Sequence, residues 1–439
     1  MTTRFFKGML HSHTLWSDGR ALPEQAAAAY RDAGYDFFSI TDHNRYGADP
    51  DRWLPVADDD GVWPPKVATP GMFAAYRAAF PDAAWRVGPD GKTEVRFSTM
   101  AEVARRFNEP GRFLVLPGWE DTAVVVGTNG VGRDLHMNCI GLDELIPRLR
   151  GATGLIEVFK GCDDLSGIVR ETAREVAELA AAKGNPPHLF FLNHPQWRFL
   201  DVPPQVLADN PEVRFFEVCN SGGDRDVPSP LPSDGFINDR FWDAVNAARC
   251  ARGEPLLYAL GTDDTHWYPG AGTDHAPGLG DAWIGVRAGS LTAAALFSAM
   301  ARGDFYASCG VDFGDIRFDN PSGTLSVAVP AKPGVAHTVK FITTKRGVPA
   351  EPVRFIDIPP LEDGRLPRSV PQFDHRVGAV VKTVSFGCGE EVRASCPMAS
   401  DDLYIRARVE SNEPATHGSS AVGLHPPVKA AWTQPYRHD

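Results

Sequence analysis

Residues 5–19 read FFKGMLHSHTLWSDG, an apolar run that ends in a His-x-His pair. The run Phe5–Leu10 predicts a short strand, and His11 and His13 follow it directly. Alternate residues of an extended chain point to the same side, so both imidazoles can reach one metal ion. Asp18 lies further along the same loop. This stretch therefore predicts a strand whose end opens into a metal site.

Short apolar runs alternate with helical segments from here to about residue 310. The apolar runs are Phe5–Leu10, Phe37–Ile40, Phe113–Leu116, Leu135–Ile140, Leu189–Leu192, Val213–Val218 and Leu256–Leu260. The helical segments are Leu22–Ala33, Leu165–Lys183, Phe241–Arg252 and Leu291–Arg302. Pro23 near the start and Gly34 past the end delimit the first of these helices. Strands that alternate with helices predict an α/β fold, either a parallel sheet or a (β/α) barrel.

Residues 45–111 interrupt this alternation with a segment rich in Trp, Pro, Asp and Gly. The segment contains a predicted helix, Met100–Phe107, and we interpret it as an insertion in a strand-to-helix loop. In a barrel such loops lie on the catalytic face. The insertion is therefore expected either to form a lid or pocket wall or to be a structural ornament, and the sequence leaves both alternatives open.

The hydrophobic period changes to two in the last part of the chain. Residues 325–329, 339–343 and 403–409 each alternate apolar with small or polar side chains, and turn residues separate these segments. This pattern predicts a smaller antiparallel, sandwich-like β-domain over 311–439, which follows a larger domain over 1–310.

The chain has 439 residues, with 56 acidic and 44 basic side chains, which gives a net charge of −12. This acidic balance argues against non-specific binding to duplex nucleic acid, which requires a basic face. The hydrophobic content of 43% is sufficient for large buried cores. We expect a cytoplasmic protein without a membrane span, because no apolar run of about 18 residues and no secretory signal is present. The seven cysteines are never spaced Cys-x-x-Cys and are expected to be thiols in a reducing compartment.

Side chains that can bind metals follow most of the apolar runs before residue 270. They are His11, His13, Asp18, His43, Glu120, His136, His194, Asp264 and His266. His43 is selected from three Asp-His dipeptides because only Asp42-His43 directly follows a buried strand. The other two dipeptides, at 274–275 and 374–375, are expected to be solvated loop residues.

The carboxyl ends of the strands in a parallel barrel open on one face, so these nine side chains are expected to converge. Six histidines and three carboxylates would be costly to desolvate together unless cations neutralised them. The sequence therefore predicts two or three divalent metal ions as cofactors. Mixed imidazole and carboxylate ligands suit zinc, manganese or iron, and the sequence does not choose among them.

The ordered set of these residues resembles the signature of the polymerase and histidinol phosphatase (PHP) superfamily. The matching motifs are His11-x-His13, Asp18, Thr41-Asp42-His43, Glu120, His136, Asn193-His194-Pro195 and Asp264-x-His266. The resemblance implies a distorted (β/α)7 barrel with a trinuclear metal site and hydrolytic, mostly phosphoesterase, activity. The motifs around Glu120, His136 and Asp264 further resemble the carbaryl-hydrolase-like branch, in which a trailing β-domain is common.

The resemblance also implies how the ligands are shared among the ions. A first ion would be held by His11, His13, Glu120 and Asp264, a second by Glu120, His136 and His194, and a third by Asp18, His43 and His266. Asp18 before Gly19 is also typical of an ordinary turn, and without it a binuclear site remains. A hydroxide that bridges two ions, held through Glu120 and Asp264, would act as the nucleophile.

Other residues near the implied ligands are candidates for orienting them or for binding substrate. Asp42, Asn193 and Asp263 are expected to hold histidine tautomers through hydrogen bonds. Aromatic and basic residues are expected to line the pocket, where they would stack on a flat group or neutralise an anion. These residues are Trp16, Trp119, Trp197, Trp267, Arg20, Arg45, Arg133 and Arg198. Core packing and surface exposure are the alternative interpretations for each.

The sequence is compatible with three functions. A phosphoesterase acting on a small organic phosphate is favoured by the superfamily resemblance and by the nearby arginines. A carbamate, ester or amide hydrolase is favoured by the branch-level resemblance and by the tryptophans. A non-catalytic metal-binding or ligand-binding protein is disfavoured because no ligand position is missing. Nothing resembling a polymerase accompanies the barrel, so a small-molecule substrate is expected rather than nucleic acid, and the sequence does not decide the oligomeric state.

Overall fold

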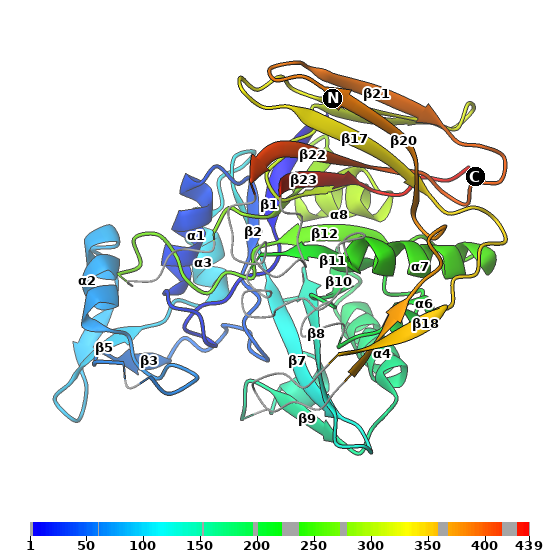
Figure 1. Ribbon diagram of the computed structural model, residues 1–439. Coiled ribbons are helices and arrows are strands. Elements are labelled where there is room, and N and C mark those ends of the chain that lie inside the picture. The colour runs from blue at the N-terminus through cyan, green and yellow to red at the C-terminus, as the bar shows by residue number, and fades with distance from the viewer. Residues whose placement is uncertain are drawn as a thin grey trace.

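The computed structural model describes residues 3–59, 61–151, 153–195, 201–221, 237–272, 279–358, 368–414 and 428–438. In these residues the chain is a mixed α/β protein in which strands outnumber helices (Figure 1). None of the helices described here is both long and apolar enough to cross a membrane. The predicted substrate residues Trp197 and Arg198 and the dipeptide Asp274-His275 lie outside the described residues.

One sheet extends from the N-terminal strands into the C-terminal part of the chain. Its strands in spatial order are β20 (Ala379–Phe386), β17 (His337–Thr343), β22 (Arg406–Pro414), β23 (Val428–Thr433), β14 (Phe305–Ser308), β13 (Trp283–Ala288), β1 (Arg4–Met9), β2 (Phe37–Ser39) and β6 (Leu114–Leu116). β1, β2 and β6 are parallel, whereas β13 is antiparallel to β1. Gly8 pairs with Phe37, and a Cβ atom at Gly8 would lie only 1.9 Å from the Phe37 ring. Any larger residue at position 8 would therefore clash with the Phe37 ring, which packs against the backbone of β1.

The second sheet lies beside the first. Its strands in order are β12 (Tyr258–Thr262), β11 (Phe215–Asn220), β10 (Leu189–Leu192), β8 (Gly132–Ile140), β7 (Gly118–Val126) and β9 (Glu157–Lys160). β10, β11 and β12 are parallel, while β7 and β8 form an antiparallel hairpin. Each apolar run predicted from the sequence contributes a strand to one of these two sheets.

The two sheets are separate hydrogen-bonded ladders that short backbone bridges join. β6 leads through Pro117 into β7, and Gly141 after β8 donates its N–H to the Pro117 carbonyl at 2.7 Å. The segments after β1 and β12 are joined where His13 donates its N–H to the Thr265 carbonyl at 2.9 Å. The antiparallel β7–β8 hairpin interrupts the parallel arrangement of the strands. The mixed α/β character is thus present, and the expected distorted (β/α)7 barrel stays a prediction.

Helices cover these sheets where the sequence predicts them. The predicted segments correspond to α1 (Pro23–Asp32), α4 (Leu165–Ala182), α7 (Ile237–Ala251) and α8 (Ala293–Ala301), and α6 (Pro204–Ala208) and a 3-10 turn (Pro147–Leu149) are additional. α1 begins at Pro23 and stops before Gly34, whose φ of 81° is left-handed. α4 begins after Asp164, whose side chain accepts the Gly167 N–H at 2.8 Å.

The insertion of residues 45–111 forms a small unit beside α1 (Figure 1). It consists of β3 (Trp53–Pro55), α2 (Pro70–Ala79), β4 (Trp85–Val87), β5 (Thr93–Arg96) and α3 (Met100–Phe107), and the three strands pair in one sheet. α3 has the predicted bounds, because Thr99 and Glu102 form a capping box at its start. Tyr76 of α2 donates a hydrogen bond to Glu24 of α1 at 2.8 Å. These contacts fix the insertion to the body of the protein.

The C-terminal strands form two antiparallel layers. One layer is the sheet of β15 (Asp315–Asp319), β16 (Thr324–Val329) and β21 (Val392–Pro397), and the other is the part of the first sheet that contains β17, β20, β22 and β23. β18 (Arg354–Ile358) and β19 (Arg368–Gln372) form a separate pair. Leu325 and Val327 of β16 are buried in the same core as Val339 and Phe341 of β17. The antiparallel period-two pattern is thus present after residue 310. Because β23 pairs with β14, the first sheet continues across that residue, and the division into two domains stays a prediction.

Candidate metal centre

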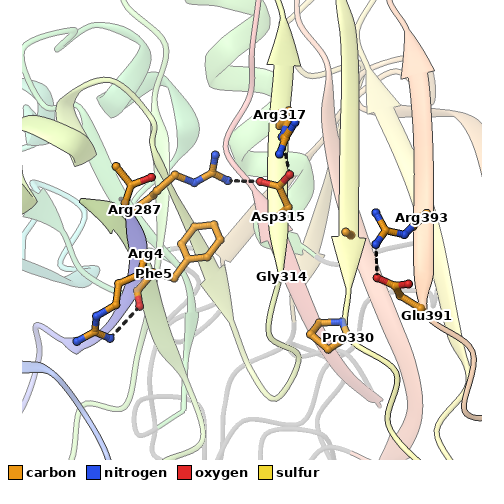
Figure 2. A pocket seen from close by; sticks show the side chains of 11 residues that line it. Arg4, Phe5, Arg287, Gly314, Asp315, Arg317, Pro330, Glu391 and Arg393 are labelled. Carbon is orange, nitrogen blue, oxygen red and sulfur yellow. Dashed lines mark hydrogen bonds and ion pairs between the residues drawn. The ribbon is translucent and has the colours of Figure 1, made fainter. Parts of the chain in front are cut away.

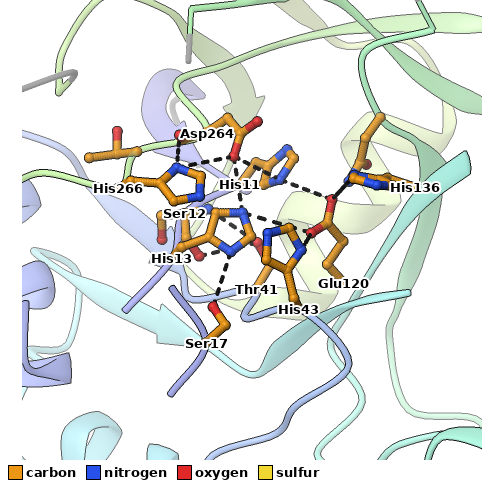
Figure 3. Close-up of polar contacts among 12 residues, drawn as sticks. His11, Ser12, His13, Ser17, Thr41, His43, Glu120, His136, Asp264 and His266 are labelled. Atoms are coloured by element: carbon orange, nitrogen blue, oxygen red, sulfur yellow. Dashed lines mark hydrogen bonds and ion pairs between the residues drawn. The ribbon is translucent and has the colours of Figure 1, made fainter. Parts of the chain in front are cut away.

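All nine predicted metal ligands lie in one cluster where the two sheets are joined, and Figure 3 labels seven of them, all except Asp18 and His194. His11, His13 and Asp18 follow β1, His43 follows β2, Glu120 lies in β7, His136 lies in β8, His194 follows β10, and Asp264 and His266 follow β12. Glu120 and His136 lie within strands rather than past strand ends, because the β7–β8 hairpin begins directly after β6. The fold therefore brings together residues that are up to 255 positions apart in the chain.

The ligand atoms form four overlapping groups, and the atoms of each group lie within 4.8 Å of one another. The groups are His13, Asp18, His43 and His266; His11, His194 and Asp264; His11, His13 and Glu120; and His43, Glu120 and His136. Three memberships differ from the sharing that the resemblance implied. His13 lies with Asp18, His43 and His266 as well as with His11 and Glu120. His194 lies with Asp264 rather than with Glu120. His43 lies with Glu120 as well as with Asp18.

Glu120 is fully buried and contacts four imidazoles. Its Oε1 atom lies 3.4 Å from His11 Nε2 and 3.3 Å from His136 Nδ1. Its Oε2 atom contacts His43 Nδ1 and lies 3.8 Å from His13 Nε2. Burial by itself raises the pKa of Glu120, but the charges of His43, His136 and His11 lower that pKa well below its usual value. The carboxylate is therefore ionised, and each oxygen faces two imidazoles.

Asp264 is a second buried carboxylate of the cluster. Its Oδ1 atom lies 3.0 Å from His13 Nε2 and 3.3 Å from His11 Nε2, and its Oδ2 atom lies 3.9 Å from His194 Nε2. Burial raises its pKa, and the charges of His11 and His13 lower that pKa well below the usual value. The backbone of Asp264 has a φ of 51°, in the left-handed region that residues other than glycine rarely adopt. Such strain is typical of functional sites, where the surroundings hold it in place.

Several of the ligand atoms are buried and have no hydrogen-bond partner in the described part of the chain. They are His11 Nε2, His13 Nε2, His136 Nδ1 and Asp264 Oδ1. A buried polar group left unpaired costs about 1–3 kcal/mol. A divalent cation among these nitrogen and oxygen atoms would satisfy them, and the donor set suits zinc, manganese or iron. The residues present therefore fit a metal centre.

The protonation of the histidines differs across the cluster. Burial alone lowers the pKa of His11 and of His43, but neighbouring carboxylates raise both values well above the usual one. Burial and the imidazoles of His43 and His266 lower the pKa of His13 to about 3. His13 is thus a neutral ligand in the metal-free chain. A cation must instead displace protons from His11 and His43, so metal binding releases protons.

One side of the cluster is more exposed than the other. The side chains of His266 and His136 are 22% and 14% exposed, while those of His11, His13 and Glu120 are fully buried. His266 and His136 therefore form the more exposed edge of the cluster.

Glu217 in β11 supports the cluster and is absent from the sequence prediction. Its Oε1 atom lies 2.7 Å from His11 Nδ1, and its Oε2 atom accepts the His194 N–H at 2.8 Å. The contact at Nδ1 fixes the His11 ring so that Nε2 points into the cluster. The only signal in the sequence is one carboxylate within the apolar residues Phe-Phe-Glu-Val-Cys at 215–219.

The three residues expected to hold histidine tautomers make different contacts. Asp42 accepts a hydrogen bond from Ser17 Oγ at 2.5 Å and so fixes the loop after β1. Asn193 donates to Glu120 Oε1 at 2.6 Å. Asp263 accepts backbone N–H groups just before β13 at 2.7–3.0 Å. The hydrogen bonds named here support two loops and one carboxylate, and Asp42 is linked to the His13 ring through Ser17 Oγ, which lies 3.4 Å from His13 Nδ1. The expected hold on histidine tautomers stays a prediction.

Two of the tryptophans expected to line the pocket are core residues. Trp16 is buried and packs against Phe97, and Trp119 is fully buried in a separate apolar cluster. Neither offers a ring face to a substrate, so the predicted stacking role is corrected to packing for both. Trp267 is partly exposed, and its ring centre lies 5.9 Å from that of His266. Trp267 therefore stays a candidate for the pocket.

The arginines near the cluster are engaged within the protein. Arg20 pairs with Asp59 at 2.5 Å. Arg45 and Arg133 donate to backbone carbonyl groups at 2.9–3.1 Å. The carboxylate of Asp59 offsets the charge of Arg20, while Arg45 and Arg133 keep their charge and are held in place by neutral carbonyl groups.

A separate cavity of about 730 Å³ lies between β1, β13 and the sheet of β15, β16 and β21 (Figure 2). It is lined by none of the nine predicted ligands. Its arginines are paired with carboxylates: Arg287 and Arg317 contact Asp315, and Arg393 contacts Glu391. We assign this cavity no part in the chemistry of the metal centre.

Neither a protein-family model nor a curated protein sequence matches the chain. Two solved structures are similar to it at low scores. One is a two-domain protein from Bacteroides vulgatus containing a predicted PHP-like metal-dependent phosphoesterase, with 14% identity over 99% of this chain and 95% of that chain and a TM-score of 0.39. The other is a candidate metal-dependent phosphoesterase from Bifidobacterium adolescentis, with 14% identity over 62% of this chain and 91% of that chain and a TM-score of 0.31. Both scores are too low to carry an argument about fold or function.

Removal of a single histidine is expected to lower the metal content of the protein. Protein purified with Mn²⁺ or Zn²⁺ should lose roughly one ion per chain in His136→Ala or His194→Ala, because each variant removes a ligand from one group. Elemental analysis measures this stoichiometry. His375→Ala is the matched control, since its side chain is 89% exposed and belongs to none of the four groups. Unchanged stoichiometry in both cluster variants would remove the two histidines from the site.

Proposed function

We propose that the protein is a metal-dependent hydrolase of the PHP type and that its substrate is a small organic phosphate ester. The observation that carries the proposal is the convergence of six histidines and three carboxylates at one partly exposed cluster. The order of these residues in the chain resembles the PHP signature, and phosphoesterases predominate in that superfamily. The resemblance to the carbaryl-hydrolase-like branch is part of the same proposal.

The proposed site holds two or three divalent ions. Glu120 belongs to two groups and is the proposed bridging ligand between two ions. Asp264, His11 and His194 form another group, which shares His11 with one of the two Glu120 groups. Asp18 belongs to a further group with three histidines, which is the proposed position of a third ion. The nine donors are compatible with zinc, manganese or iron.

Bound cations would supply a water molecule of lowered pKa and positive charge opposite the substrate oxygens. The residues of the chain hold the ligand side chains in position. Asn193 donates to Glu120 Oε1 at 2.6 Å, and Thr122 donates to Oε2 at 3.0 Å, so both oxygens of this carboxylate are held from the protein side. Glu217 holds His11 in the same way. Ligands fixed in this manner need little rearrangement during the reaction.

A carbamate, ester or amide hydrolase is the second candidate. The observation in its favour is that Arg20, Arg45 and Arg133 are all bonded within the protein. Among the described residues, these three arginines would then offer fewer free donors to a phosphate dianion, and a neutral carbonyl substrate would need no such charge. A non-catalytic metal-binding protein is the third candidate.

Substrate panels distinguish these functions. We expect metal-loaded protein to hydrolyse alkyl and aryl phosphates, and protein stripped by a chelator to be inactive until Mn²⁺ or Zn²⁺ is restored. A parallel panel of aryl esters and carbamates tests the second candidate. Turnover confined to that second panel would replace the phosphoesterase proposal. Inactivity on both panels in protein with full metal content would favour the non-catalytic alternative.

A further inference from the structure

Asp18 has two oxygens with different surroundings. Its Oδ1 atom lies 3.5 Å from His43 Nε2, 3.3 Å from His266 Nε2 and 4.0 Å from His13 Nδ1. Its Oδ2 atom accepts a hydrogen bond from Trp63 Nε1 at 2.9 Å. One oxygen therefore faces three imidazoles, and the other is held by an indole from a distant part of the chain.

Trp63 belongs to the insertion, between β3 and α2. The residue is 51% exposed, although its N–H reaches a carboxylate whose side chain is only 10% exposed. A second contact ties the insertion to the same loop, because Asp59 pairs with Arg20 and the Arg20 N–H is bonded to the His266 carbonyl at 2.7 Å. The insertion thus contacts the cluster directly at its more exposed side.

An indole that keeps half of its surface in water beside a polar cluster is suited to stacking. Its N–H anchors one edge, and the ring can cover a flat group of a ligand. Trp16 and Trp119, which the sequence suggested for this purpose, are buried in the core. Trp267 lies next to His266, which faces the same Asp18 oxygen as the other imidazoles. Aromatic surface is therefore concentrated on the Asp18 side of the cluster.

We infer that Trp63 positions Asp18 as a one-oxygen metal ligand and forms a wall of the substrate pocket that selects esters with a planar leaving group. The second half of the inference rests on the proposed hydrolase function, whereas the first half does not. A charge-assisted N–H to carboxylate bond fixes Oδ2, so Oδ1 alone is directed at the three histidines. The insertion is then a functional part of the pocket rather than an ornament.

Two substitutions separate the two roles of Trp63. Trp63→Phe removes the N–H donor and keeps an aromatic ring, and Trp63→Ala removes both. Trp85→Phe and Trp85→Ala are matched controls, because Trp85 is another tryptophan of the insertion, is 45% exposed, and its described ring contacts are with Phe73 and Arg77. Metal affinity is measured by competition with a chelator. Binding of phenylphosphonate and methylphosphonate to metal-loaded protein is measured by calorimetry, which needs no turnover.

Both Trp63 variants are expected to lose about tenfold in affinity for one ion, as is usual when a residue that orients a ligand is removed. Trp63→Ala is expected in addition to weaken phenylphosphonate about tenfold while methylphosphonate binding is kept, because only the aryl group stacks. Both Trp85 controls should behave as the wild type.

Wild-type metal affinity in Trp63→Phe would overturn the proposal that Trp63 positions Asp18. An unchanged ratio of the two phosphonate affinities in Trp63→Ala would overturn the proposal that Trp63 forms a wall of the pocket. If neither phosphonate binds to the metal-loaded wild type, the phosphoesterase proposal and the pocket wall fail, while the metal measurement still decides the positioning role.

Discussion

Replacement of Glu120 by glutamine is expected to abolish hydrolysis and to remove roughly one metal ion per chain. Glu120 is the carboxylate that two of the four ligand groups share, and both of its oxygens face imidazoles. Glutamine keeps the size of the side chain but presents one N–H₂ group where an acceptor is needed. It also removes the negative charge that would offset the proposed cations. Activity should fall by at least about a thousandfold, the scale seen when a central electrostatic group is lost.

The loss must be separated from a general loss of stability. Elemental analysis, activity on aryl phosphates and the midpoint of thermal unfolding are measured on the same preparation. Glu24→Gln is the matched control, because Glu24 is also a buried carboxylate but contacts Tyr76 and Ser98 in the contact between α1 and the insertion. This control should lower the unfolding midpoint and keep the metal content. Full metal content and activity in Glu120→Gln would contradict the proposed bridging role.

The positions of the ligands could be predicted because most of them follow buried strands. His11, His43 and His194 each come within three residues of the end of an apolar run, and the fold places the ends of those strands together. Short apolar runs bounded by polar residues are a strong local signal for buried strands. The sequence therefore indicated both the strands and the chemistry at their ends.

The antiparallel pairing of β7 with β8 could not be predicted, because it depends on strand direction. The residues around Glu120 and His136 have the same apolar character in a parallel or an antiparallel strand. In the structure they belong to a hairpin whose register pairs Glu120 with Asn138 and Thr122 with His136. The short connection between these strands allows the antiparallel pairing, and periodicity alone does not distinguish it from two successive parallel strands.

Contacts between distant segments are the other part that the sequence did not show. Trp63 reaches Asp18 across 45 positions, and nothing near Trp63 indicates a metal ligand. Conversely, Trp16 lies close to ligands in the sequence but packs into the core, because its side chain points to the opposite side of the loop, toward Phe97. Closeness to a ligand in sequence is thus a poor guide to which side of a loop a residue occupies.

Replacement of Glu217 by glutamine is expected to weaken metal binding by about 10–100-fold, although this residue belongs to none of the four ligand groups. Its Oε1 atom contacts His11 Nδ1 at 2.7 Å and accepts from Thr262 Oγ1 at 2.7 Å. Its Oε2 atom accepts the His194 N–H and an Asn220 N–H, each at 2.8 Å. A carboxylate can accept from all four groups, because it has only acceptor sites.

Glutamine has one acceptor atom and one donor group in the same space, so the four groups cannot all keep donating to it. If the amide N–H₂ group faces His11 Nδ1, that nitrogen must accept, and the proton moves to Nε2. His11 would then present a donor to the cluster and could not bind a cation in that tautomer. If the amide is turned the other way, its N–H₂ group meets the backbone N–H of His194 and displaces the loop after β10.

Competition with a chelator measures the change in metal affinity for Glu217→Gln, and urea unfolding of metal-free protein measures stability in parallel. Glu24→Gln again serves as the control for loss of a buried carboxylate, and it should alter stability without altering metal affinity. A Glu217→Gln variant that loses stability but binds metal as tightly as the wild type would show that Glu217 only packs the interior. Weakened metal binding with the fold retained would instead establish that Glu217 in β11 fixes the orientation of His11.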